Sequence, residues 1–214
     1  MKLPFTSLSL LTLCLMLAAF PVAAQTVYSN GPTNGNTDAW TINFGFVVSD
    51  TFNVTNTGTT ITGGSFAMWL YEGDTLTSAE LSITSQENGG TSYFDQTLNF
   101  MQSGCASNQY GFNVCTENTT FNGPTLNSGT YWLNLQNASV SSGNPVFWDE
   151  NSGPSSASES SVGTIPSESF TVLGSESSTT TSTTTTGTTP EPSSIMLFGS
   201  GVLGLAGMLR RRLF

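Results

Sequence analysis

The chain has 214 residues and a formal net charge of −10, and only 8% of its side chains are charged. Its four basic residues lie at the two ends, so no lysine, arginine or histidine occurs between residues 3 and 209, where all 14 carboxylates lie. This composition excludes catalysis by a histidine base or a lysine nucleophile. It also argues against nucleic acid as a partner, because phosphates are bound mainly by lysine and arginine.

The N-terminal segment, residues 1–24, is typical of a signal peptide. Lys2 supplies the positive start, residues 8–20 form an apolar stretch, and small residues lead to Ala24. We predict that signal peptidase cleaves between Ala24 and Gln25 and that the protein is exported. The alternative is a retained membrane anchor, for which the apolar stretch is short.

The body, residues 25–174, has the pattern of a β-protein. Apolar and polar side chains alternate in residues 65–71, 79–85 and 129–137, and Gly, Asn, Asp and Ser cluster between such runs. We predict an all-β fold, an antiparallel β-sandwich of about eight to ten strands with Ig-like or jelly-roll topology. Almost no helix is expected before Ser193.

The cysteines indicate one disulfide. Cys14 leaves with the signal peptide, and Cys105 and Cys115 remain as an even pair in an exported chain. Closing a loop of about ten residues removes somewhat under 3 kcal/mol of unfolded-state entropy in the chain model. A redox-active or metal-binding pair is the alternative, but the CxxC spacing and histidine are both missing.

Two tryptophans are candidate sugar contacts. By alternation Trp69 and Trp132 point away from the apolar faces of their strands, where an exposed tryptophan can stack on a sugar ring. The alternative is that each packs half-buried under a loop. The tryptophans motivate the hypothesis of a carbohydrate-binding module for exopolysaccharide.

The carboxylates indicate no catalytic site. Asp149 and Glu150 are adjacent and would face opposite sides of a strand, whereas glycoside hydrolysis needs two carboxyls set across one bond. We therefore predict no enzyme activity, and a secreted glycan hydrolase is only the second alternative. Residues 33–38 and 148–153 offer oxygen ligands for Ca²⁺, although neither has EF-hand spacing and both resemble plain turns. No other metal or cofactor is expected.

Residues 175–189 read SESSTTTSTTTTGTT and contain no aliphatic or aromatic side chain. Such a segment cannot bury enough surface to offset the entropy of ordering it. We predict a disordered linker, and we hypothesise that it is O-glycosylated.

The last segment, residues 190–214, combines three features. A Pro-Glu-Pro tripeptide is extended by its prolines, residues 193–209 carry no charge and can form a short transmembrane helix, and three arginines follow. The arginines would hold that end in the cytoplasm while the body lies outside. The sorting residues are Pro190, Glu191 and Pro192, and the topology anchor is Arg210, Arg211 and Arg212.

This arrangement resembles the PEP-CTERM sorting signal of Gram-negative and related bacteria. The resemblance implies recognition by an exosortase, cleavage near the Pro-Glu-Pro tripeptide, and loss of the helix from the inner membrane. The body would then reach the cell surface or the extracellular matrix. An ordinary tail anchor is the alternative reading.

The body is also similar to uncharacterised secreted β-domains attached to such anchors. The similarity lies in YSNGP at residues 28–32, WDENSGP at 148–154 and IPSESF at 165–170. It implies no activity. The sequence therefore favours a non-catalytic surface or matrix protein whose specific role is open.

Overall fold

The computed structural model describes residues 24–176, which form fourteen strands and no helix. Every strand pair is antiparallel, so the predicted all-β antiparallel fold is confirmed. There are more strands than the sequence predicted, because several pieces of two or three residues in the turn-rich regions also pair. The predicted signal peptide, linker and transmembrane helix lie outside the described residues, except at their boundaries.

The first sheet is built around β4, the strand Thr59–Leu70. β8 pairs with β4 along one edge of that strand. β14 and β11 pair with the opposite edge of β4, where they lie end to end. β1 extends the sheet beside β14, β2 beside β11, and β7 beside β8. The other strands of this sheet are β1 (Gln25–Ser29), β2 (Ala39–Thr41), β7 (Met101–Ser107), β8 (Asn113–Thr120), β9 (Thr125–Leu126), β11 (Phe147–Asp149) and β14 (Phe170–Ser175).

The second sheet has six strands in the order β13-β12-β3-β10-β5-β6. Its long central strand is β10, in which Leu133 lies opposite Asp50 of β3 on one side and Ile83 of β5 on the other. The strands are β3 (Val47–Val54), β5 (Leu76–Gln86), β6 (Gly89–Asn99), β10 (Gly129–Val140), β12 (Ala157–Glu159) and β13 (Gly163–Ile165).

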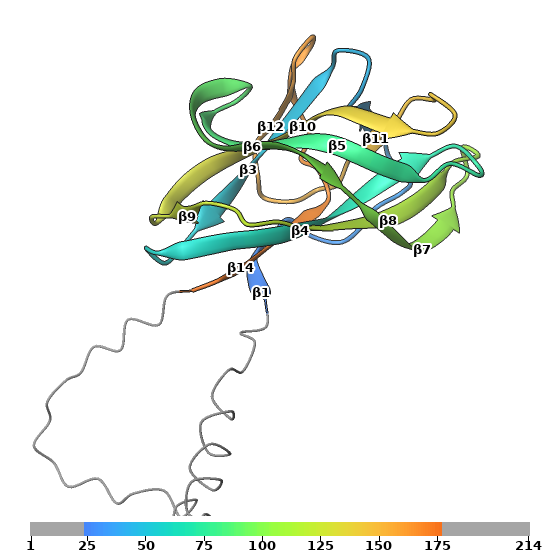
Figure 1. Ribbon diagram of the computed structural model, residues 1–214. Helices are drawn as coiled ribbons and strands as arrows, with labels where there is room; N and C mark the ends of the chain where they lie inside the picture. Colours follow the sequence, from blue (N-terminus) through green and yellow to red (C-terminus); the bar gives the residue numbers. More distant parts are fainter. Residues whose placement is uncertain (1–23, 177–214) are drawn as a thin grey trace, which may run out of the picture. The chain divides into compact units, whose positions relative to one another are not determined.

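The two sheets form two layers around one apolar core, with β5, β6 and β10 above β4 and β14 in Figure 1. The predicted inward positions of β4, β5 and β10 are buried, although Ala67 and Trp69 on the other face of β4 are buried as well. The choice between Ig-like and jelly-roll topology stays a prediction. The buried side chains on these three strands include Phe66, Met68, Leu70, Ala79, Leu81, Ile83, Tyr131, Leu133 and Leu135.

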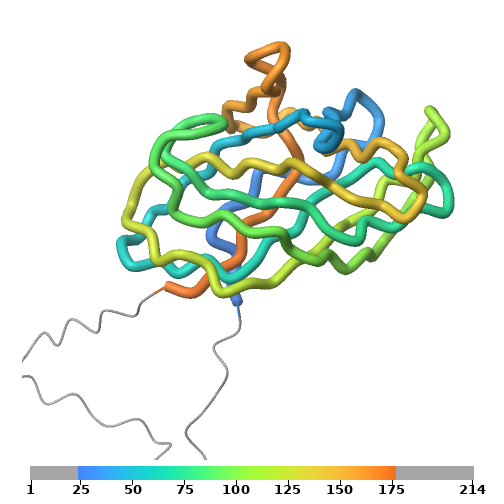
Figure 2. Tube along the Cα trace, turned by 45° about the horizontal axis from the view of Figure 1, so that its top comes forward, coloured from blue at the N-terminus to red at the C-terminus, as the bar shows by residue number. Residues whose placement is uncertain are grey.

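The two ends of the body meet in the first sheet. Gln25 at the start of β1 lies opposite Gly174 near the end of β14. The predicted signal-peptide junction at Ala24 and the start of the predicted linker are therefore neighbours in the folded body, as Figure 2 shows for the two chain ends. β14 extends to Ser175, one residue beyond the body boundary predicted from the sequence.

The β7–β8 hairpin carries the predicted disulfide. Cys105 and Cys115 are bonded, with their Cα atoms 4.1 Å apart. Cys115 faces the core, whereas Cys105 is exposed. The disulfide therefore joins the exposed edge strand β7 to β8 next to the tip of the hairpin.

Candidate functional site

The two tryptophans predicted as sugar contacts do not form one surface. Trp69 lies on β4 in the first sheet and Trp132 on β10 in the second. Trp132 is half-buried on the outer side of its strand, but Trp69 is only 5% exposed, so the prediction that Trp69 is an exposed contact is wrong. Alternation does place Trp69 on the outer face, but residues distant in sequence cover it.

Trp69 is covered by the tip of the β7–β8 hairpin and anchored by a carboxylate. The ring of Tyr110 stacks on Trp69, with centroids 5.7 Å apart and planes at 21°, and Phe112 packs beside it. The indole N–H of Trp69 donates to Asp149 Oδ1 at 2.6 Å. The sequence pattern could not show this cover, because the tip is about forty residues away along the chain.

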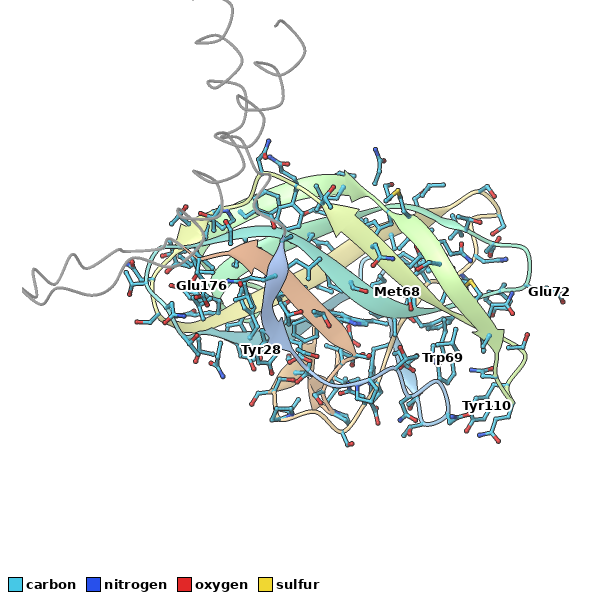
Figure 3. All side chains as sticks on the ribbon, turned by 90° about the horizontal axis from the view of Figure 1, so that it is seen from below. Tyr28, Met68, Trp69, Glu72, Tyr110 and Glu176 are labelled. Atoms are coloured by element: carbon cyan, nitrogen blue, oxygen red, sulfur yellow. A yellow bond between two sulfur atoms is a disulfide. The ribbon has the colours of Figure 1, made fainter. Side chains whose placement is uncertain are left out.

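The cover is itself an exposed aromatic surface. Tyr71 meets Phe112 edge to face at 4.9 Å, and Phe112 meets Phe147 in the same way at 5.5 Å. Tyr110 is 53% exposed and Tyr71 39% exposed, while Phe112 and Phe147 are half-buried. We call Tyr71, Tyr110, Phe112 and Phe147 the aromatic end. Figure 3 shows Trp69, Tyr110 and Glu72 at the end of the body opposite Glu176.

The hairpin tip holds Tyr110 in place. The side-chain Oδ1 of Asn108 accepts hydrogen bonds from the backbone N–H groups of Tyr110 and Phe112, each at 3.0 Å. Gly111 has φ 85°, which only glycine adopts without strain. The hydroxyl of Tyr110 donates to the Asn36 carbonyl at 3.1 Å. The most exposed aromatic ring of the aromatic end is therefore fixed from both sides before any ligand arrives.

A strained turn carries a further exposed aromatic ring. Phe44 has φ 58° and is 65% exposed, and the turn is closed by the Phe46 N–H donating to the Asn43 carbonyl at 3.2 Å. The Asn43 amide donates to the Asn144 carbonyl, and the Asn144 amide donates to Asp74 in the turn after β4. These bonds link the Phe44 turn to the turn that follows Tyr71.

The structure also contains buried carboxyls that the sequence did not reveal as a group. Asp50, Asp149 and Glu168 are inaccessible to solvent, and Glu150 is nearly so. Residues 24–176 contain no basic side chain, so none of these acids has a cation beside it within the described residues. Both side-chain oxygens of Glu168 are buried without a hydrogen-bond partner.

Burial governs the protonation of these acids. Desolvation raises the pKa of Asp50 to about 6, although hydrogen bonds from backbone N–H groups, among them that of Glu168 at 2.7 Å, lower it in part. The pKa of Glu168 is raised well above its usual value by burial and by the charges of Asp50, Glu150, Asp149 and Asp38. Burial without a cation therefore favours the neutral, protonated form of Glu168.

A further buried acid, Glu117, lies apart from this group. Glu117 on β8 lies opposite Phe66 of β4 and is completely inaccessible, and neither of its side-chain oxygens has a hydrogen-bond partner. Burial raises the pKa of Glu117 to about 7. A carboxyl in this setting is too enclosed to contact a substrate.

The three segments that resemble secreted β-domains meet around the buried acids. The Asn30 amide donates to Asp50 at 3.3 Å and to the Glu168 carbonyl at 2.6 Å, which joins residues 28–32 to 165–170. The Asn151 amide donates to the Asn30 carbonyl at 2.8 Å, which adds residues 148–154. We call these contacts the polar junction. Its residues bind one another, so these segments hold the fold together.

The two loops predicted as calcium ligands also lie side by side. The backbone N–H groups of Asn34 and Gly35 donate to the carboxylate of Asp149 at 2.7 and 2.8 Å, so protein donors already occupy it. Among residues 24–176, no three cysteine, aspartate or glutamate side chains are arranged to hold a metal ion. The loops bury Asp149 as a structural acceptor, and calcium stays a prediction.

Comparison with known proteins identifies the C-terminal segment. A family model for the PEP-CTERM protein-sorting motif matches residues 188–212. The match includes the Pro-Glu-Pro tripeptide, the apolar segment and Arg210 to Arg212. No curated protein matches the chain. Within the described part of the chain, no helix is long and apolar enough to cross a membrane. The chain thus carries a PEP-CTERM sorting motif, as its sequence predicted.

Proposed function

We propose that this sorting motif delivers the body to the cell surface or the extracellular matrix, where it acts without catalysis. The observation that carries the proposal is the family match at residues 188–212. In this account signal peptidase releases the chain at Ala24, and an exosortase then cleaves near Pro190 to Pro192. The inner membrane holds residues 193–209 only until that second cut.

The absence of catalysis is supported by the chemistry of the body. Residues 24–176 have no histidine, lysine or arginine, and the acids with the most strongly raised pKa values, Glu168 and Glu117, are enclosed. A general acid must reach the atom that it protonates. A glycan hydrolase is therefore the weakest of the candidate functions, and turnover of a glycan or ester substrate by the purified chain would revive it.

Mass spectrometry of mature protein from the producing cells tests the processing. We expect a chain that begins at Gln25 and lacks Leu213 and Phe214. A matched variant, Glu191→Ala together with Pro192→Ala, should keep the C-terminus and accumulate in the inner membrane. Wild-type mature protein that still ends at Phe214 would overturn the proposal and leave an ordinary tail anchor.

The aromatic end favours glycan binding as a second function. Exposed, rigidly held tyrosines present flat apolar faces with a polar edge, which is the type of surface that stacks on sugar rings. Tyr110 covers Trp69 at 5.7 Å, so a bound ring should change the emission of that tryptophan. A fluorescence titration with exopolysaccharide tests this function, and unchanged emission with no heat of binding would remove it.

A further inference from the structure

We propose that the aromatic end binds a glycan that carries protonated amino sugars. This inference rests on the glycan-binding function proposed above and names the class of ligand. Two features of the surface support it, namely its fixed aromatic faces and the sign of the charge around them.

The aromatic faces are fixed before binding. The Tyr110 backbone N–H donates to Asn108, the Tyr110 hydroxyl donates to the Asn36 carbonyl at 3.1 Å, and the disulfide joins the two strands next to the hairpin tip. A ring that is already immobilised loses little conformational entropy when a ligand stacks on it. Tyr110 stacks on Trp69 and Tyr71 packs against Phe112, which itself contacts Trp69, so both exposed tyrosines belong to one connected aromatic cluster.

The Phe44 turn indicates that exposed aromatic surface is kept at a cost. A non-glycine residue at φ 58° is strained, and burial does not compensate Phe44, which is 65% exposed. A polar residue such as asparagine would suit the same turn better. Hydrogen bonds through Asn43 and Asn144 to Asp74 connect the backbone of this turn to the turn that follows Tyr71.

The surrounding charge has a single sign. Glu72 follows Tyr71 directly, and Asp38 lies two residues beyond Asn36, and both are exposed. Residues 24–176 hold no cation, so a polymer of uronic acids or sulfated sugars would be repelled without any ion pair in return. A protonated amine gains attraction to the carboxylates and to the tyrosine faces together. Charge complementarity therefore selects the basic glycan.

The experiment compares three probes on the full chain in detergent micelles. These are a glucosamine hexamer, the same hexamer fully N-acetylated, and alginate, each followed by calorimetry and tryptophan emission. We expect the glucosamine hexamer to bind, the acetylated hexamer to bind about tenfold more weakly, and alginate not to bind. Binding of the glucosamine hexamer should weaken with added salt.

Variants locate the site. Tyr110→Ala and Tyr71→Ala should each weaken binding of the glucosamine hexamer at least about tenfold, whereas Tyr110→Phe keeps the ring and should retain most of it. Glu72→Gln should weaken the glucosamine hexamer and leave the acetylated one unchanged. Tyr93→Ala is the matched control, because Tyr93 is 42% exposed on β6 and lies outside the aromatic end.

The outcomes are distinguishable. Equal binding of the charged and acetylated hexamers would overturn the inference and leave glycan binding intact. Tighter binding of alginate would overturn it as well. If no probe binds, both the inference and glycan binding fail. None of these results touches the exosortase proposal, which is tested by the mature C-terminus.

Discussion

The polar junction buries acidic side chains, which are usually exposed, whereas the aromatic end exposes aromatic side chains, which are usually buried. The junction buries Asp50 and Glu168 where no cation is available, whereas the aromatic end exposes Tyr110 and Tyr71. Burying a charge is costly unless it is paired or neutralised. The junction solves this problem with protons and amide donors and so serves the fold. The aromatic end has no such internal compensation, which is why we assign it to a ligand.

The largest expected effect is the dependence of the free energy of unfolding on pH. In the folded protein the pKa of Asp50 is about 6 against its ordinary value of 3.8, and the pKa of Glu117 is about 7 against 4.5. The folded state therefore holds protons that the unfolded state releases, so stability is complete below the unfolded pKa and falls as pH rises through the folded pKa. Asp50 alone should lower the free energy of unfolding by about 2 kcal/mol between pH 4 and pH 8, and Glu117 adds to this loss.

Denaturant unfolding at pH 5 and at pH 8 measures this effect. The free energy of unfolding should be clearly lower at pH 8. A profile that is flat, or that rises with pH, would mean that the buried acids are charged in the folded protein and compensated in some other way.

The next largest effect should follow from Asn30→Ala. The Asn30 amide donates to Asp50 and to the Glu168 carbonyl, so its removal leaves the buried carbonyl without this donor and Asp50 Oδ2 with the Glu168 N–H alone. We expect a loss of about 2 kcal/mol in the free energy of unfolding. Asn122→Ala, at an exposed position, is the control and should change stability little. Similar losses in both variants would contradict the role of the junction.

Glu117→Gln should have a smaller and opposite effect. The neutral amide replaces a carboxyl that must lose its proton at high pH inside the core. We expect a gain of about 1 kcal/mol at pH 8 and almost none at pH 5, measured by denaturant unfolding. The exposed Glu72→Gln variant should show no such pH-dependent gain. A loss of stability at pH 8 would indicate that the Glu117 carboxylate is charged and bound.

Tyr110→Ala should have the smallest effect on stability and a clear spectroscopic one. Tyr110 is half exposed, so its loss should cost no more than about 1 kcal/mol. It uncovers Trp69, whose emission should shift to longer wavelength. A thermal unfolding midpoint that collapses in this variant would make the aromatic end a part of the core, and the contrast with the polar junction would disappear.

Much of the fold was predictable because the pattern of a strand is local. The alternation at Leu81, Ile83, Leu133 and Leu135 identifies the inward face wherever the strand lies, since successive side chains point to opposite sides. The pairing of Cys105 with Cys115 followed from an even count in an exported chain. The sorting motif is a linear signal, so it was readable without any fold.

The site was not predictable, because it depends on what covers the outer faces of the sheets. Trp69 and Trp132 looked alike in sequence, yet Tyr110 covers the first and the second lies half-buried on the other sheet. The meeting of Asn30 with Asp50 and Glu168 likewise joins residues that are far apart along the chain.

The sequence by itself thus determined that this is an exported all-β protein with a sorting tail, one disulfide and a body without cations. Only the tertiary structure decided which aromatics are exposed and which carboxyls are buried. The physical reason is that strand period and linear signals depend on neighbours along the chain, whereas exposure and pKa depend on contacts between distant segments.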